Sequence, residues 1–273
     1  MIPLLPFVIT TLALFMLGSI FGSFLNVVVY RSIAGTSWVT GRSKCDACGY
    51  TIRWFDNIPI FSFLFLRGKC RDCKTPISIT HPVMEIISGS LFVWWYWFGA
   101  FFFQLTQTPF QVLQPLFWLV VAMILLMIFV ADALHYLIPD SMVFGLFGIT
   151  ILYRVSLVIT GQMQLIDFVY SLVAAVLACA FFAVLWAGTK GKGMGFGDVK
   201  LVVPLALLVG WQQTFLALFL SFIFGAVVGV GLIIVGRKKL GQVIPFGPFL
   251  ILGTITTLLV GENLLHWYWT LLL

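Results

Sequence analysis

Long apolar stretches, separated by short charged segments, constrain this chain more than any other feature of its sequence. A helix needs about 20 apolar residues to cross the hydrocarbon core of a bilayer, and the chain offers several stretches of that length. Only 9% of the residues are charged, whereas a soluble domain carries about 25%. Strand-length segments of alternating polarity, which a transmembrane barrel needs, do not occur in the sequence. The sequence therefore predicts an all-α, polytopic membrane protein.

Charges, prolines and glycines divide the apolar sequence into about eight expected transmembrane helices. The first stretch is uncharged, is followed by its basic residue, and is too long for a secretory signal peptide, so we expect it to be a permanent span. The sixth stretch is short, and the last could extend into the apolar tail. The expected spans are residues 4–30, 84–103, 112–131, 140–160, 166–187, 199–211, 213–235 and 245–262.

The basic residues indicate how these spans are oriented, because Lys and Arg gather in cytoplasmic loops. With eight spans, 14 of the 15 basic residues fall on one side, in loops at residues 31–83, 188–200 and 236–244. The exception is Arg154, near the outer end of the fourth span, where its side chain can extend to lipid headgroups. We therefore expect these loops to be cytoplasmic and both termini periplasmic. The net charge of +6 follows from this topology, and no nucleic-acid partner is expected.

The first loop carries two Cys-x-x-Cys pairs, Cys45 with Cys48 and Cys70 with Cys73. Two such pairs suit a tetrahedral zinc site, and four thiolates leave no open position for a substrate, so the expected site is structural. Disulfides are one alternative, but thiols stay reduced in the cytoplasm. A redox role is another, for which a single pair in a βαβ unit is typical. We expect a small cytoplasmic zinc-binding loop domain whose folding depends on the metal.

Two aspartates follow the third apolar stretch, Asp132 and Asp140. Ionisable groups beside a hydrophobic span are energetically costly, which makes them candidates for function. Asp140 comes directly after Pro139 at the start of the fourth span, where it can cap the helix. Asp132 has no helix start beside it to cap, so it is the stronger functional candidate.

A glycine-rich segment precedes the sixth span, with Gly195 and Gly197 just before Asp198. A helix cap is the simplest structural explanation of Asp198. The glycines favour a larger role, because backbone without side chains permits close approach and an extended segment can pair with a peptide. A phosphate loop is disfavoured, since the segment lacks a preceding strand and a Gly-Lys-Ser/Thr ending. We expect Asp198 to be catalytic and both glycines to contact a peptide substrate.

Asp132 and Asp198 fall on the same expected side of the membrane, which suits an aspartyl-protease mechanism. Two close carboxylates would share one proton, so that one activates water while the other polarises the scissile carbonyl. A transporter that uses both aspartates as proton carriers is an alternative, but the sequence has no internal repeat to support it. A non-catalytic scaffold docked through the cysteine loop is another, and it leaves the glycine segment unexplained.

Several segments, in order along nearly the whole chain, together resemble the type IV prepilin peptidases. The Gly-x-Gly-Asp motif alone is shared with other intramembrane aspartyl proteases, whereas the full set is far more specific. The matching segments are 21–31 (FGSFLNVVVYR), the four cysteines, 81–85 (HPVME), Asp132, 138–140 (IPD), 195–201 (GFGDVKL) and 244–248 (IPFGP).

The resemblance implies that Asp132 and Asp198 cut prepilins or type II secretion pseudopilins just after a glycine that follows a basic leader. It also implies methylation of the new N-terminus with S-adenosylmethionine, in which the cytoplasmic loop is implicated. Acidic residues of that loop, including Glu85, are candidates for contact with the leader or the methyl donor. We expect a bacterial inner-membrane protein with a first transmembrane helix at 1–31, a cytoplasmic four-cysteine loop domain at 32–83 and a transmembrane peptidase domain at 84–273.

Overall fold

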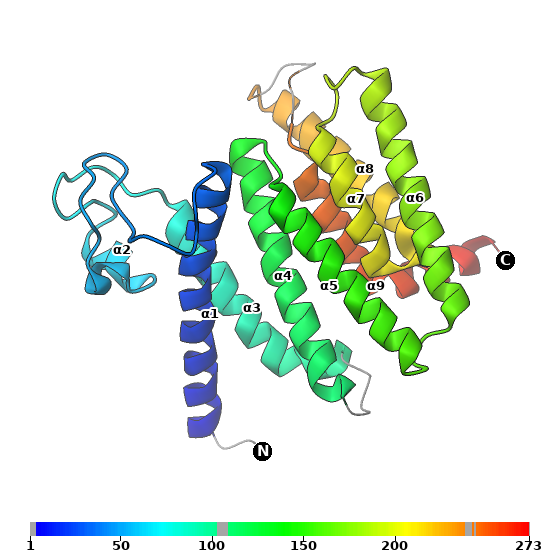
Figure 1. The fold of residues 1–273 in the computed structure, drawn as a ribbon, viewed down its shortest axis with the longest axis horizontal. Helices are drawn as coiled ribbons and strands as arrows, with labels where there is room; N and C mark the ends of the chain where they lie inside the picture. The colour runs from blue at the N-terminus through cyan, green and yellow to red at the C-terminus, as the bar shows by residue number, and fades with distance from the viewer. Residues whose placement is uncertain (1–3, 103–108, 238–241, 243, 273) are drawn as a thin grey trace. The chain divides into compact units, whose positions relative to one another are not determined.

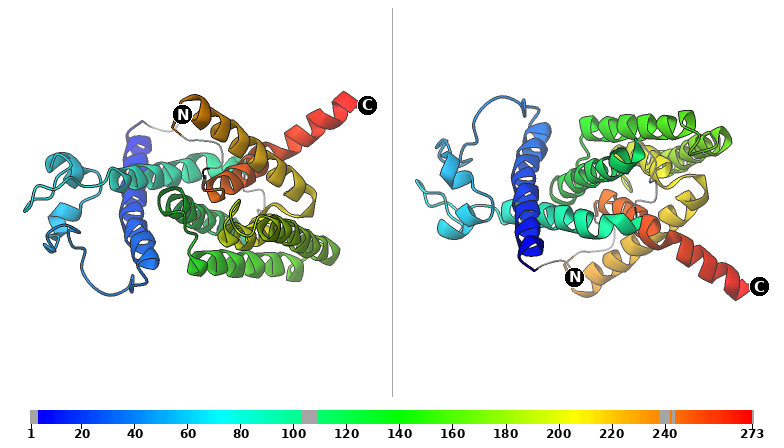
Figure 2. Two further views of the ribbon diagram at one scale, coloured as in Figure 1. Left: turned by 90° about the horizontal axis from the view of Figure 1, so that it is seen from above. Right: turned by 90° about the horizontal axis from the view of Figure 1, so that it is seen from below.

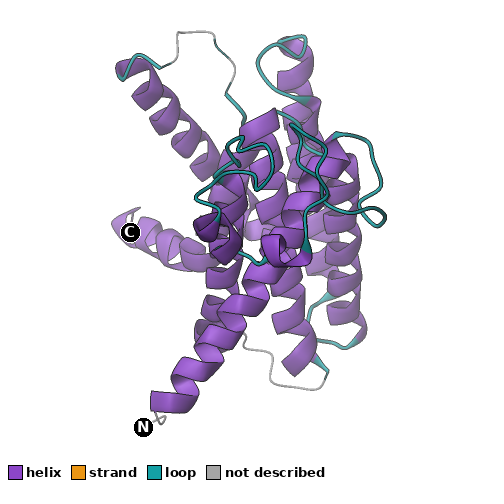
Figure 3. Cartoon of the chain, turned by 90° about the vertical axis from the view of Figure 1, so that its left-hand side faces the viewer, coloured by secondary structure: helices purple, strands orange, loops and turns teal. Residues whose placement is uncertain are grey.

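All regular structure in the described part of the chain is helical, which confirms the predicted all-α class (Figure 3). The computed structural model describes residues 4–102, 109–237, 242 and 244–272. The elements are α1 (Leu4–Ile33), η1 (Trp54–Asn57), α2 (Phe61–Phe65), α3 (Thr80–Phe102), α4 (Phe110–His135), α5 (Asp140–Ile159), α6 (Leu165–Gly188), α7 (Phe196–Val209), α8 (Trp211–Ile234) and α9 (Gly247–Leu272).

Within those described ranges, eight long helices lie at the positions of the eight expected spans, and six of them are long and apolar enough to cross a membrane. These six are α1, α4, α5, α6, α8 and α9. Helix α7 has 14 residues, or about 21 Å, which is less than the ~30 Å hydrocarbon core. The protein is thus a multi-pass membrane protein. Lys238 and Lys239, which we had placed in the third basic loop, lie outside the described residues.

The chain divides into two compact units, Met1–Met127 and Ile128–Leu273, with the boundary inside α4. In the first unit α1 packs against α3 (Figure 1). Glycines permit this contact: a Cβ on Gly22 would lie 2.8 Å from Glu85 Cα, and one on Gly89 would lie 2.7 Å from Ser19 Oγ. Small residues of this kind let membrane helices approach closely. The two helices form a tight pair, and the cysteine loop connects them.

Helix α7 is the buried helix of the second unit, in contact with α5, α6, α8 and α9 (Figure 2). Nine of its 14 residues are buried, and Asp198 is one of them. Polar groups within a membrane are tolerated where protein rather than lipid surrounds them. The position of α7 therefore allows it to carry a carboxylate inside the membrane domain.

The C-terminal end of α7 is held by Arg154 of α5. Its Nη2 donates a hydrogen bond to the carbonyl oxygen of Leu208 at 3.2 Å. The last carbonyls of a helix lack partners within the helix, and inside a membrane they must find them elsewhere. The half-buried guanidinium of Arg154 thus caps the short helix, a contact that the sequence did not indicate.

Candidate active site and metal centre

Asp198 lies in the first turn of α7 and is buried. It is not the helix cap, because Gly195 occupies that position in an extended conformation (φ −73°, ψ 148°) and no side chain caps the helix. The Oδ1 atom of Asp198 has no hydrogen-bond partner in the described part of the protein. An unpaired buried acceptor costs about 1–3 kcal/mol, and more if charged. Its presence in a folded protein therefore needs a functional explanation.

Asp132 lies in the last turn of α4 and is also buried. A carboxylate is disfavoured at the C-terminal end of a helix, so the position serves no capping purpose. Its Oδ2 accepts a hydrogen bond from the backbone N–H of Gly247, the first residue of α9, at 2.9 Å. A Cβ at Gly247 would lie 2.6 Å from that oxygen. Glycine is thus required for the start of α9 to orient Asp132.

The structure places Asp132 and Asp198 in the same unit, on segments that pack against one common residue. Ile138, in the turn between α4 and α5, connects their surroundings. A Cβ on Gly197 would lie 3.0 Å from Ile138 Cβ, and one on Gly247 would lie 3.2 Å from Ile138 Cδ1. Glycine at position 197 is therefore explained by packing against Ile138. Two buried carboxylates from different helices thus meet around one apolar side chain.

Asp140 does not cap α5, and the interpretation of it as a helix cap was wrong. Pro139 holds the N-cap position, and no side-chain cap hydrogen bond is present there. The carboxylate of Asp140 instead forms an ion pair with Lys200 of α7. Lys200 belongs to the second expected basic loop and to the segment 195–201, but its pairing with Asp140 was not predicted. Its place two residues after Asp198 puts its side chain on another side of α7 from that carboxylate.

The two cysteine pairs in the first unit are built alike. In both, the first cysteine donates its backbone N–H to the carbonyl five residues later at 2.9 Å. The residue after each second cysteine is left-handed, with φ 72° at Gly49 and 60° at Lys74. Such turns aim both thiols of a pair toward one point. The repeated geometry is what two matching zinc knuckles require.

The four sulfur atoms converge as a metal site requires. The Sγ atoms of Cys45, Cys48, Cys70 and Cys73 all lie within 4.8 Å of one another. Zinc–sulfur bonds of about 2.3 Å in a tetrahedron place sulfurs about 3.8 Å apart, and Cys45 Sγ lies 3.8 Å from Cys73 Sγ. The four cysteines are free thiols, so the disulfide alternative is not realised. Hydrogen bonds with Thr75 lower the pKa of the Cys73 thiol to about 6, whereas the pKa of the Cys48 thiol is raised to about 12 by desolvation and by its thiol neighbours Cys73 and Cys45.

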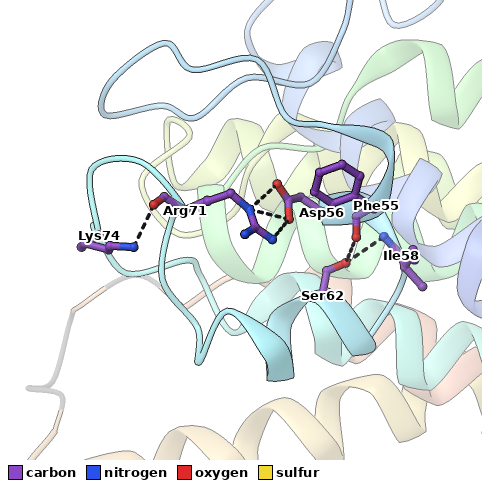
Figure 4. A network of polar contacts seen from close by, with 6 residues as sticks. All are labelled: Phe55, Asp56, Ile58, Ser62, Arg71 and Lys74. Atoms are coloured by element: carbon purple, nitrogen blue, oxygen red, sulfur yellow. Dashed lines mark hydrogen bonds and ion pairs between the residues drawn. The ribbon is translucent and has the colours of Figure 1, made fainter.

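A polar network ties the second cysteine pair to the segment between the pairs (Figure 4). Arg71 donates to both carboxylate oxygens of Asp56, with Nη2 at 2.6 Å from Oδ1. The guanidinium also lies over the Phe55 ring, 5.5 Å from its centroid. Lys74 Nζ donates to the Arg71 carbonyl at 2.8 Å. The knuckle and the η1 segment therefore form one folded piece.

Glu85 lies in the second turn of α3, in the first unit, and is buried. Its Oε2 accepts the backbone N–H of Ile60 at 2.7 Å. Ile60 has a φ of 64°, which is rare for a β-branched residue, and the N–H of Phe61 donates to Pro59 O across it at 2.6 Å. Glu85 therefore holds a strained turn of the loop against the helix pair.

Two family models match the chain. The Bacterial Peptidase A24 N-terminal domain matches residues 16–98, which include the four cysteines and Glu85. The Type IV leader peptidase family matches residues 119–230, which include Asp132 and Asp198. The two matches correspond to the helices and motifs described above.

Curated proteins with the name "Prepilin leader peptidase/N-methyltransferase" are similar to this chain over nearly its full length. That of Aeromonas hydrophila is 30% identical, over 94% of this chain and 92% of the relative. That of Stutzerimonas stutzeri is 32% identical, over 95% and 93% respectively. That of Bacillus subtilis is 31% identical, over 93% and 96%. No solved structure matches the chain.

Proposed function

Because the chain belongs to the type IV leader peptidase family, we propose that it removes the leader peptide from type IV prepilins or type II secretion pseudopilins and methylates the new N-terminus. Its curated relatives carry both activities in their name. The observation that best supports the peptidase activity is that Asp132 and Asp198 are both buried in the second unit, on segments that pack around the same Ile138. A proton carrier would not need the orienting bond from Gly247 or the glycine-rich approach to Asp198.

We assign catalysis to Asp132 and Asp198 acting as a pair with one shared proton. The ionised carboxylate takes a proton from a water molecule whose oxygen attacks the scissile carbonyl carbon. The protonated carboxyl donates a hydrogen bond to the carbonyl oxygen and then transfers its proton. Collapse of the tetrahedral intermediate breaks the C–N bond as the carboxyl that took the water proton passes it to the leaving nitrogen, which becomes the new amino terminus. The other carboxylate recovers a proton from the diol, so that the pair again holds one shared proton. The free Oδ1 of Asp198 is available for the water or the substrate.

The backbone before Asp198 is proposed to receive the substrate, with Gly195, just before α7, and Gly197, in the first turn of α7, as contacts. Gly195 is extended, and a Cβ there would lie 3.5 Å from Asp198 Oδ2. A side chain would therefore occupy the space through which a peptide reaches the carboxylate. Gly197 contributes in addition by keeping α7 close to Ile138. An extended peptide can bind such backbone by main-chain hydrogen bonds.

Gly247→Ala should lower kcat/KM for leader cleavage by about 100-fold. The added Cβ would displace the Asp132 carboxylate, and a shift of about 1 Å in a catalytic group can cost that much. Gly145→Ala is the matched control, because a Cβ there would meet nothing within 4 Å. Cleavage of a prepilin by each purified variant in detergent gives the comparison. Equal rates for the two variants would show that the Gly247 contact does not orient Asp132.

For methyl transfer we propose the first unit, with S-adenosylmethionine as donor and the four-cysteine loop at 32–83 as the associated domain. This domain would lie between a first transmembrane helix at 1–31 and a peptidase domain at 84–273. Glu85 is the acidic residue proposed to contact the basic leader or the cationic sulfonium of the donor. Its buried carboxylate and its bond to Ile60 place it where the loop meets the helix pair.

Glu85→Gln tests this role without breaking the turn. The amide oxygen of glutamine can still accept the Ile60 N–H, while the negative charge is lost. We expect KM for S-adenosylmethionine or for the leader to rise about tenfold, since a charge-assisted contact contributes ~1.5–3 kcal/mol. Glu85→Ala is the contrasting variant, because it also frees the Ile60 N–H. Unchanged kinetics in the glutamine variant would leave Glu85 a purely structural residue.

We propose that the four cysteines bind one structural zinc ion, held by Cys45, Cys48, Cys70 and Cys73. The convergence of the sulfurs supports this, and four thiolate ligands leave no coordination position for catalysis. The metal would fix both knuckles and thereby the loop between α1 and α3.

We propose that the cysteine loop and the N-terminal end of α7 face the cytoplasm, with both termini periplasmic, in the bacterial inner membrane. The clustering of basic residues in three loops supports this orientation. A basic leader that remains on the cytoplasmic side would then reach the two aspartates without crossing the bilayer.

The proposed function is tested by incubating the purified chain with a prepilin, first alone and then with S-adenosylmethionine. We expect mass spectrometry to detect loss of the leader in the first reaction and gain of one methyl group in the second. Intact prepilin in both reactions would refute the proposal. Cleavage without methylation would refute its second half only.

A further inference from the structure

The cysteine loop exposes large apolar side chains that no part of the described chain covers. Trp54 of η1 is 76% exposed, and on α2 the exposed fractions are 48% for Phe61, 64% for Leu64 and 84% for Phe65. We call these four residues the apolar face. A loop surrounded by water would normally bury such residues, and contiguous exposed apolar surface marks an interaction site.

Helix α2 directs three apolar side chains away from the rest of the loop. Phe61, Leu64 and Phe65 are spaced as i, i+3 and i+4, so they share one side of the helix. The buried Ser62, about 100° around the helix from Phe61, donates its Oγ hydrogen to the Phe55 carbonyl at 2.9 Å and accepts the N–H of Ile58 at 3.0 Å (Figure 4). The half-buried Phe63 lies on the side away from the three and faces Gly68, where an added Cβ would lie 3.1 Å from its ring. Helix α2 is thus attached through Ser62 and Phe63, and its other three apolar side chains point outward. Lipid is the surrounding that makes this arrangement favourable.

The contact between Ile60 and Glu85 fixes how deep α2 lies along the helix pair. Ile60, the residue just before α2, donates its N–H to Glu85 Oε2 at 2.7 Å. Glu85 comes five residues after Thr80, the first residue of α3, which is about 7.5 Å along the helix. Glu85 in turn packs against Gly22, which lies in the part of α1 that is long and apolar enough to cross a membrane, Leu5–Ile33. Helix α2 therefore begins beside that span, although it belongs to the loop.

Basic residues frame the apolar face. Arg53 precedes Trp54, and Arg67 and Lys69 follow α2; all three are exposed. Long basic side chains at such positions reach phosphate groups while the apolar residues enter the acyl region. Tryptophan is itself enriched at the boundary between headgroups and hydrocarbon.

We propose that the apolar face inserts into the headgroup and acyl boundary of the bilayer in which the chain is embedded, with anionic phospholipid at Arg53, Arg67 and Lys69. The cysteine loop is then a membrane-docked element rather than a domain free in solution. The metal site beside it is held at the lipid surface, where a membrane-bound substrate is found. This inference does not depend on the proposed catalytic chemistry, because it concerns only the first unit.

Photo-crosslinking of the full chain in lipid nanodiscs of phosphatidylethanolamine and phosphatidylglycerol tests the inference. The crosslinker p-benzoylphenylalanine replaces Phe65 in one sample, Val176 of the apolar helix α6 in a second, and the exposed Asp72 of the second knuckle in a third. We expect phospholipid adducts at position 65 in a yield similar to that at 176, and at least tenfold above that at 72. A yield at 65 equal to that at 72 would overturn the proposal. If a prepilin is included and the crosslinker at position 65 reacts with the prepilin but not with phospholipid, the proposal is overturned in favour of a substrate-docking surface.

Two double variants distinguish loss of membrane contact from misfolding. The double substitution Leu64→Asp with Phe65→Asp should remove the apolar face from the bilayer. A crosslinker in place of Trp54 should then no longer form lipid adducts. The double substitution Leu64→Phe with Phe65→Leu keeps the apolar face and should retain them. Leader cleavage and bound zinc, measured in both, report whether each unit is folded. Lipid adducts at position 54 that persist with both aspartates present would also overturn the proposal.

Discussion

Asp198→Asn should reduce leader cleavage at least 10³-fold and leave the fold intact. The asparagine keeps the size of the side chain at a buried position but cannot ionise or exchange a proton. A group that transfers protons in the transition state contributes about 10²–10⁴-fold to the rate, and loss of one member disables a pair that acts as a unit. Single-turnover cleavage of a prepilin in detergent measures the loss.

Asp132→Asn should have an effect of the same order, because each carboxylate needs the other to hold the shared proton. The matched control is Asp140→Asn, eight residues along the chain from Asp132. Its carboxylate is exposed and pairs with Lys200, so its loss should leave much of the activity. Full cleavage by either the Asp132→Asn or the Asp198→Asn enzyme would refute the catalytic assignment. An inactive Asp140→Asn enzyme would show that the wrong aspartate of α4 and α5 was chosen.

The positions of the helices could be predicted from the sequence because the membrane imposes a strong local rule. Every backbone polar group in lipid must be satisfied within its own segment, so each apolar stretch of sufficient length becomes a helix. Even the short sixth span was visible, as residues 199–211. The structure ends the helix at Val209, because Gly210, with a φ of 85°, separates α7 from α8. What the sequence could not supply was the reason a short helix is tolerated. That depends on the surrounding helices and on Arg154, which are tertiary features.

The charged residues of the candidate site could be predicted from the sequence, whereas the contacts that orient them could not. Asp132 and Asp198 are conspicuous because carboxylates are rare in apolar sequence. Gly247 and Ile138 have ordinary chemistry, and their importance comes from contacts between segments more than 50 residues apart. The cap assigned to Asp140 failed for the same reason, since its partner Lys200 lies on another helix. Local sequence rules indicate which structural roles a residue can have, and tertiary contacts decide which of these roles it has.

The cysteine knuckles were easier to predict than the aspartate site, because the geometry of each knuckle is local. Each pair and its turn are encoded within six residues, 45–50 and 70–75, so the sequence motif alone predicted that the two thiols of each pair converge. The neighbouring link from Arg71 to Asp56 was not predicted. It depends on how the segment between the pairs folds back.

Cys70→Ser should abolish metal binding and unfold the knuckles of the first unit. Cys70 is the buried member of the cluster, and its sulfur is one of four that lie within 4.8 Å. Structural zinc in small modules contributes about 10–16 kcal/mol of apparent binding energy, most of which serves folding. We expect bound zinc, measured by elemental analysis, to fall from one equivalent per chain to near zero. The backbone amides of both knuckles should then exchange with solvent at least 10²-fold faster.

Cys179→Ser is the matched control, because this cysteine lies in α6, away from the cluster in sequence and in the other unit. It should retain one equivalent of zinc and the slow amide exchange of the knuckles. Treatment of the unmodified protein with a strong chelator should reproduce the Cys70→Ser pattern, and added zinc should reverse it. Methyl transfer should fall further than cleavage in both cases, since the knuckles belong to the first unit and the two aspartates to the second. Slow exchange in metal-free protein would instead mean that the hydrogen bonds and the Arg71–Asp56 pair hold the loop without an ion.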